Sequence, residues 1–218
     1  MPDPAATNPT TLAADDLQTE QPPLRRLGIY GGTFDPVHWG HLLLAESARE
    51  ACDLDAVWFV PADTPPHKQG RTITEPRHRL QMLEFATTGL PRYEVSRIEI
   101  GRDGPSFTVE TLGLISEQHP ETELFFLMGG DSLAELPTWR QPERIAELAT
   151  IVAVNRGDAP LEVPAACQSF ADRIQQVTMP ASGLSATDLR ERARTGRSLL
   201  FRTPRSVELY IAQHKLYR

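Results

Sequence analysis

Cysteines, basic residues and long apolar runs are all scarce in this sequence of 218 residues. Its only two cysteines, Cys52 and Cys167, lie far apart, which argues against a disulfide framework or a cysteine-based metal site and indicates reduced thiols in a cytoplasmic protein. Lys and Arg total 22 against 29 Asp and Glu, and the resulting net charge of −7 argues against general nucleic-acid binding, which needs a basic face. No apolar run approaches the length of a membrane span, so no membrane partner is expected.

The length allows one large domain with a substantial core. Residues 1–24 are rich in Pro, Ala, Thr and Asp and contain neither a basic start nor an apolar segment. An ordinary signal peptide is therefore not expected, and we predict that residues 1–24 form a disordered leader. Residues 25–218 are predicted to form a single domain, and the sequence gives no preference between a monomer and an oligomer.

A glycine-rich segment near the start of this domain carries the clearest functional signal. The apolar run Leu27–Tyr30 predicts a buried strand, Gly31–Thr33 a close-approach turn, and Trp39–Cys52 an amphipathic helix. A strand followed by a glycine turn and a helix N-terminus forms an anion site, because free backbone N–H groups and the helix dipole point the same way. His38 and His41 are three residues apart and would share a face beside that site.

Further apolar runs alternate with helical patterns along the rest of the domain. The additional strands are expected at Val57–Val60, Tyr93–Ile100, Leu124–Met128, Thr150–Val154 and Gln176–Met179. The additional helices are expected at Arg77–Thr87, from a cap at Ser106 or Thr108 to His119, at Glu143–Leu148, and after a cap at Ser185 or Thr187. This alternation predicts an α/β fold with a Rossmann-like, doubly wound, mostly parallel sheet, whose ligands bind at the carboxyl edge.

The histidine pair also carries a family resemblance. His38-Trp39-Gly40-His41 resembles the His-x-Gly-His motif of the nucleotidylyltransferase superfamily. The longer run Gly31–Leu42 is similar to that of the bacterial nicotinate mononucleotide adenylyltransferases, and it matches neither the dinucleotide fingerprint nor a P-loop. The resemblance covers about residues 25–218.

Later segments strengthen this resemblance. Those similar to the family's segments are Pro65–Lys68, Ser106–Leu112, Gly129–Ser132, Trp139 and Leu184–Arg190. Val207–Tyr217 looks like the family's closing helix. Leu184 stands where the family has isoleucine, which is a tolerable apolar exchange. The run Phe201–Pro204 departs from the family's usual apolar Leu-Val-Pro, which leaves the packing of that turn open.

The resemblance implies a role for each matching residue. His38 and His41 would be catalytic and act on the ATP phosphates, by hydrogen bond or positive charge. The implied ATP and phosphate contacts are Gly31, Gly32, Thr33, Phe34, Lys68, Ser185, Thr187 and Arg190. The implied contacts of the acceptor and its pyridine ring are Thr108, Gly129, Asp131, Trp139 and Arg156, of which Arg156 is also a candidate phosphate contact because it follows a strand. Mg²⁺ is expected on the phosphates, with no ligands from protein side chains.

The implied activity is the transfer of adenylate from ATP to nicotinate mononucleotide, which yields deamido-NAD and pyrophosphate in NAD biosynthesis. One alternative is an adenylyltransferase for another small acceptor, such as phosphopantetheine or nicotinamide mononucleotide. Phosphopantetheine enzymes commonly have threonine at the position of His38. The other alternative is a nucleotide-sensing module without catalysis, against which the intact His38, His41 and Arg190 argue.

Overall fold

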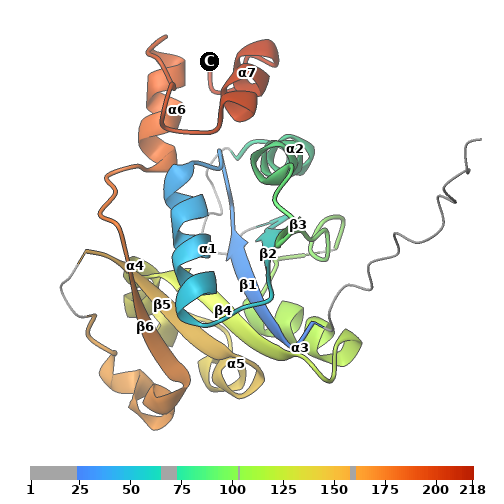
Figure 1. Ribbon diagram of the computed structural model, residues 1–218, viewed down its shortest axis with the longest axis vertical. Coiled ribbons are helices and arrows are strands. Elements are labelled where there is room, and N and C mark those ends of the chain that lie inside the picture. The colour runs from blue at the N-terminus through green and yellow to red at the C-terminus, as the bar shows by residue number, and fades with distance from the viewer. Residues whose placement is uncertain (1–23, 65–72, 103, 158–160) are drawn as a thin grey trace, which may run out of the picture.

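The computed structural model describes residues 24–64, 73–102, 104–157 and 161–218 (Figure 1). Most of the expected leader and the run that contains Lys68 lie outside these residues. The described part of the chain forms one sheet of six parallel strands in the order β3-β2-β1-β4-β5-β6. Their bounds are β1 (Arg26–Gly32), β2 (Ala56–Pro61), β3 (Tyr93–Val95), β4 (Glu123–Gly129), β5 (Thr150–Arg156) and β6 (Ile174–Met179). The predicted doubly wound α/β fold is confirmed.

Helices cover both faces of this sheet. One face packs against α1 (Trp39–Ala51), α2 (Pro76–Thr87), α6 (Ala186–Arg194) and α7 (Arg205–Gln213). The other packs against α3 (Thr108–Gln118), α4 (Gly130–Glu135), α5 (Pro142–Leu148) and the 3₁₀ helices η2 (Leu136–Thr138) and η3 (Ala165–Arg173). Within the described ranges, no helix is both long enough and apolar enough to cross a membrane.

The strands read as continuous apolar runs because side chains on both faces of the sheet are buried. Successive residues of a strand point to opposite faces, so Tyr30 and Leu127 enter the core beneath α1, whereas Ile29 and Phe126 enter the core beneath α3 and α5. In the register of the sheet, Tyr30 pairs with Leu127 of β4. The two central strands therefore contribute to both cores.

Two strand predictions differ from the structure. Strand β3 ends at Val95 instead of Ile100, because the Ser96 hydroxyl accepts a hydrogen bond from the Ile98 N–H (3.4 Å) and the chain turns. Gly31 and Gly32 are the last residues of β1 and pair with β2, so the turn begins at Thr33.

Two helix predictions also differ. Phe107 occupies the N-cap position of α3, so neither Ser106 nor Thr108 caps this helix. Helix α7 ends at Gln213, and Tyr217 lies beyond it with a positive φ of 64° that a helix does not allow. By contrast, Ser185 caps α6 as predicted, since its hydroxyl accepts the Asp188 N–H at 3.1 Å.

A fully buried guanidinium joins the loops that leave the first two strands. Arg79 of α2 donates to the carbonyl oxygens of Thr33 (3.0 Å), Ala62 (2.7 Å), Asp63 (3.2 Å) and Thr74 (2.8 Å). Burial lowers the pKa of Arg79, although the nearby carboxylates oppose this shift. A buried charge is stabilised only when hydrogen bonds replace its lost water, and these four carbonyls supply them.

We expect Leu127→Ala to lower the free energy of unfolding by about 2–5 kcal/mol, because it empties space on a central strand where the side chain is fully buried. The control is Leu209→Ala on α7, whose side chain is half exposed and whose replacement should cost less than about 0.5 kcal/mol. Urea unfolding followed by circular dichroism measures both. Equal effects of the two substitutions would contradict the assignment of β4 to the core.

Candidate functional site

Two stacked histidines begin helix α1. His38 occupies the N-cap position and His41 the third helical position, and their ring centroids lie 3.7 Å apart at an interplanar angle of 22°. The backbone N–H of His38 donates to Nδ1 of His41 at 3.2 Å. Because Nδ1 accepts, a neutral His41 carries its proton on Nε2. His41 can therefore offer a phosphate oxygen an Nε2–H donor.

Gly40 leaves room for this stacking. A Cβ at position 40 would lie 3.0 Å from both Cε1 and Nδ1 of the His38 ring, closer than side-chain carbons normally approach. The glycine of the His-x-Gly-His motif is thus explained by the imidazole that packs over its backbone.

Burial sets the protonation state of His38, which is only 2% exposed. Burial, reinforced by the positive charge of Arg156, lowers the pKa of His38 to about 4. His38 is consequently neutral at pH 7 in this structure and can act by hydrogen bonding. Arg156 lies at the exposed end of β5, and its charge acts on this histidine. Its contact with a phosphate stays a prediction.

Asp35 connects the histidine segment to helix α6. Its backbone carbonyl accepts Nη1 of Arg190 at 2.7 Å, while Nη2 of Arg190 donates to the Thr187 hydroxyl at 3.1 Å. Ser185 begins the same helix through its N-cap hydrogen bond. The predicted phosphate contacts on α6 are therefore brought beside the loop that precedes α1.

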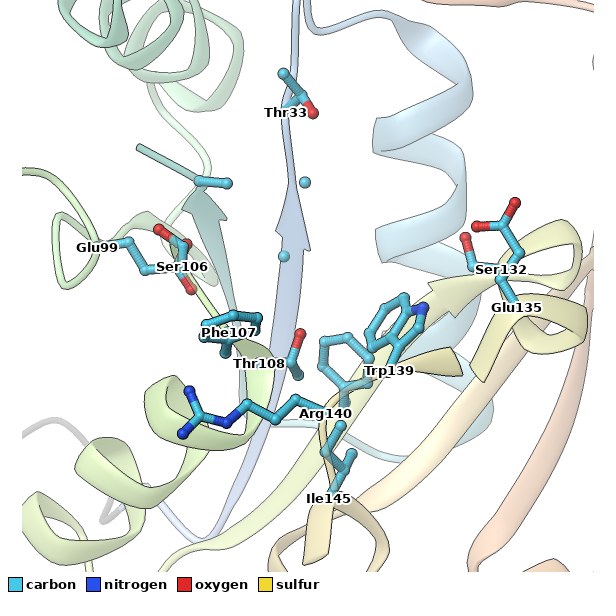
Figure 2. Close-up of a pocket in the computed structure, with 14 residues that line it drawn as sticks. Thr33, Glu99, Ser106, Phe107, Thr108, Ser132, Glu135, Trp139, Arg140 and Ile145 are labelled. Carbon is cyan, nitrogen blue, oxygen red and sulfur yellow. The ribbon is translucent and has the colours of Figure 1, made fainter. Parts of the chain in front are cut away.

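A cavity of about 240 Å³ opens between the end of β1 and the start of α3 (Figure 2). The predicted site residues that line it are Gly31, Gly32, Thr33, Thr108 and Trp139. Figure 2 shows Thr108 near Trp139, with Glu99 and Ser106 farther along the wall. The Trp139 ring is oriented edge-on to the ring of Phe126, with centroids 5.8 Å apart. The first phosphate segment and the predicted pyridine contacts thus share one cavity.

Other predicted residues take different places. The Phe34 side chain is buried against the His41 ring, with centroids 5.2 Å apart, so Phe34 can offer a ligand only its backbone. Asp131 is exposed, and in the described part of that segment Ser132 and Glu135 line the cavity instead. Gly129 ends β4 and is the N-cap residue of α4. Lys68 lies outside the described residues.

Glu99 is a site residue that the sequence reasoning missed. Its carboxylate is 6% exposed, lines the cavity and accepts the Thr111 hydroxyl at 2.5 Å. Burial raises the pKa of Glu99, while the hydroxyls of Thr111 and Ser106 and the nearby Arg102 oppose the shift. The sequence does show one acidic residue between Ile98 and Ile100, which could have indicated a buried carboxylate. Because the sequence predicts a strand there, this residue is assigned to the strand.

The described residues do not form a cage for a metal ion. They contain no group of three or more His, Cys, Asp or Glu side chains placed to hold one. The buried carboxylate nearest the histidine segment, Asp35, already accepts hydrogen bonds on both oxygens, from Thr74 and Tyr217.

Comparisons with known proteins agree with this arrangement. The Cytidylyltransferase-like family matches residues 29–192. A probable nicotinate-nucleotide adenylyltransferase of Thermomicrobium roseum is 46% identical over 202 residues, which cover 89% of this chain and 92% of that protein. One from Roseiflexus is 45% identical over 88% of this chain and 98% of that protein. The solved Plasmodium falciparum nicotinic acid mononucleotide adenylyltransferase, complexed with NaAD, has the same fold, with a TM-score of 0.73 at 17% identity over 88% of this chain and 97% of that one.

The depressed pKa of His38 predicts a loss of stability in acid. The unfolded chain binds a proton on this histidine below pH about 6.5, whereas the folded chain does so only below about 4. The contribution of His38 is therefore fully present above pH 6.5 and is lost as the pH falls towards 4. At pH 4.5 the loss should reach about 2–3 kcal/mol relative to pH 7.5.

Urea unfolding of the wild type and of His38→Asn at both pH values measures this contribution. The wild type should lose more stability than the variant, because asparagine does not titrate. The same pH dependence in both proteins would contradict a neutral, buried His38.

Proposed function

Because the chain belongs to the nicotinate-nucleotide adenylyltransferase family, as its sequence motifs predict, we propose that it transfers adenylate from ATP to nicotinate mononucleotide. The products are deamido-NAD and pyrophosphate, and the reaction is a step in NAD biosynthesis. The observation that carries this proposal is the stacked histidine pair at the start of α1, which packs through Phe34 against Gly32. Neither histidine lines the cavity of Thr108 and Trp139, but Gly32 is part of its wall. The histidine pair can hydrogen-bond the phosphates of ATP, and the cavity can hold the pyridine ring of the acceptor.

The acceptor's own phosphate is the nucleophile, so no covalent enzyme intermediate is required. One of its oxygens forms a bond to the α-phosphorus of ATP, and the bond from that phosphorus to the bridging oxygen of the leaving pyrophosphate breaks. The protein must align two anions that repel each other and must stabilise the charge that moves to pyrophosphate. We assign the second task to Nε2–H of His41, a neutral His38 and the guanidinium of Arg190.

Several further groups support phosphate binding in this scheme. Gly31, Gly32 and Thr33 at the end of β1 allow a close backbone approach. Ser185 and Thr187 are assigned to the nucleotide, and Arg156 to the phosphate side of the site. Lys68 is assigned to the phosphate tail from its sequence motif. Mg²⁺ enters as the ATP complex, as part of the substrate, and no step is assigned to it.

The acceptor would occupy the cavity beside α3. The first N–H groups of a helix have no partner within the helix, so the start of α3 at Thr108 offers donors to the nicotinate carboxylate. Trp139 offers a surface for stacking. Arg140 also lines this cavity, where its side chain donates to Glu110 at 2.7 Å and packs over the Phe107 ring.

The two cysteines support the cytoplasm as the proposed compartment. Cys52 and Cys167 are buried and free, and burial raises the pKa of both thiols, which makes them unreactive. Free thiols of this kind are typical of proteins that work in a reducing environment.

The proposed acceptor is tested by measuring pyrophosphate release from MgATP with nicotinate mononucleotide, nicotinamide mononucleotide and phosphopantetheine. We expect nicotinate mononucleotide to exceed the amide in kcat/KM by roughly 10²-fold, because the amide NH₂ would face N–H donors and leave a buried group unpaired. Equal use of both pyridine nucleotides would contradict the proposed carboxylate contact. Preferred use of phosphopantetheine would identify a different enzyme, and release with none of the three would identify a nucleotide-sensing module.

The catalytic assignment is tested by His41→Ala, which should lower kcat by about 10²–10³ and change the KM for ATP much less. A preorganised donor acts mainly on the charge that develops in the transition state. The control is His214→Ala, because His214 lies exposed just after α7 and packs against Tyr210. This control should turn over at the wild-type rate. Wild-type turnover of His41→Ala would remove His41 from the mechanism.

A further inference from the structure

A tyrosine far along the chain reaches the loop that leads into α1. The hydroxyl of Tyr217 donates to Oδ1 of Asp35 at 2.6 Å, a contact between residues 182 positions apart. The other oxygen of this carboxylate accepts the Thr74 N–H at 3.2 Å. Asp35 is only 5% exposed, so its charge depends on these partners in place of water.

The same aspartate fixes a phosphate-binding candidate. Arg190 donates to the Asp35 carbonyl at 2.7 Å, so the position of its guanidinium depends on where the Asp35 backbone lies. A cavity of about 390 Å³ brings these groups together, with Asp35, Thr74, Arg190 and Tyr217 in its wall. The contact of Tyr217 therefore acts on two groups at once: the loop that ends at His38, and Arg190.

Neighbouring contacts attach the same loop to the chain between α6 and α7. The Thr203 hydroxyl donates to the carbonyl of Val37 at 2.8 Å, and the Trp39 N–H donates to the carbonyl of Arg202 at 3.1 Å. Both residues that flank His38 are thus held by the later part of the chain. Of these contacts, the one from Tyr217 is made to a charged side chain, the carboxylate of Asp35.

The backbone on either side of this contact has an uncommon conformation. After α7 ends, Lys215 and Tyr217 both take positive φ angles, 52° and 64°. Such angles are uncommon for residues other than glycine and cost free energy, so they persist where surrounding contacts compensate. Burial and the adjacent Asp35 charge raise the pKa of Tyr217, which keeps its hydroxyl protonated as a donor at neutral pH.

From this geometry we infer that Tyr217 is a positioning residue of the proposed adenylyl transfer, which acts through Asp35 on Arg190 and on the loop that carries His38. The inference rests on the proposed function. Without the hydroxyl, a buried carboxylate oxygen loses its partner and the loop relaxes. A displacement of about 1 Å in an aligned site can cost about 10²-fold in rate, so a partial displacement should cost about 10-fold.

The test is Tyr217→Phe, which removes only the hydroxyl. We expect kcat to fall about 10-fold and the Kd of MgATP, measured by calorimetry, to rise several-fold. The KM for nicotinate mononucleotide should stay within twofold, because its cavity lies beside α3. A general loss of structure would change all three quantities together.

Two further variants make the test specific. Tyr210→Phe is the matched control, since the Tyr210 hydroxyl on α7 forms a 2.8 Å hydrogen bond with Nδ1 of His78 and has no contact with Asp35. It should leave kcat and the Kd of MgATP unchanged. In an Asp35→Ala background, Tyr217→Phe should have little further effect, because the acceptor of the Tyr217 hydroxyl is already removed.

The outcomes separate the two proposals. A wild type that makes no deamido-NAD overturns the proposed function, and the Kd of MgATP still decides the role of Tyr217. An active wild type whose Tyr217→Phe variant keeps kcat and Kd within twofold overturns the positioning role alone. An equally large effect of Tyr217→Phe in the Asp35→Ala background would also overturn it.

Discussion

The direction in which each strand's connection leaves the sheet decides where this protein can bind a ligand. Connections between parallel strands are almost always right-handed, so a sheet that grows outward from β1 in both directions must send its helices to opposite faces. Here β1 leads to α1 on one face, whereas its neighbour β4 leads to α4 on the other. The backbones therefore separate at the carboxyl ends of β1 and β4, and ligands bind at such a point. The histidines and the cavity both lie beside this separation.

Long-range polar contacts then give the loops at this edge a defined conformation. The guanidinium of Arg79 holds carbonyls that follow β1 and β2, and the carboxylate of Asp35 is held by Thr74 and Tyr217. Both charges are buried, so removing a partner from either would leave a group without water or hydrogen bond. Because losing any of these hydrogen bonds would cost free energy, the loops are held in the one conformation that forms all of them. Phosphate-binding groups on loops can in this way be as well ordered as groups on the strands.

The parts of the fold that local patterns encode could be predicted from the sequence, and the parts that distant contacts decide could not. Apolar runs and the glycine segment predicted the parallel sheet and the start of α1, and the Ser185 cap was predicted from its neighbours alone. The carbonyl contact from Arg79 to Thr33 spans 46 residues and that from Arg190 to Asp35 spans 155, and no periodicity carries such information. Glu99 was missed for a related reason. Its burial depends on hydroxyls from a later helix, whereas its neighbours alone resemble a strand.

The position of Tyr217 along the chain has a consequence for protein synthesis. All six strands precede it, so the sheet can form on the ribosome before its hydroxyl emerges, whereas the core beneath α1 is completed by Val207 and Ile211 of α7. During that interval Asp35 has only part of its hydrogen-bonding set. A nascent chain that has folded its sheet would therefore present an incomplete nucleotide site. If Tyr217 positions the site as we propose, folding of the sheet and completion of the Asp35 contacts are separate steps, because the second needs residues that come after the last strand.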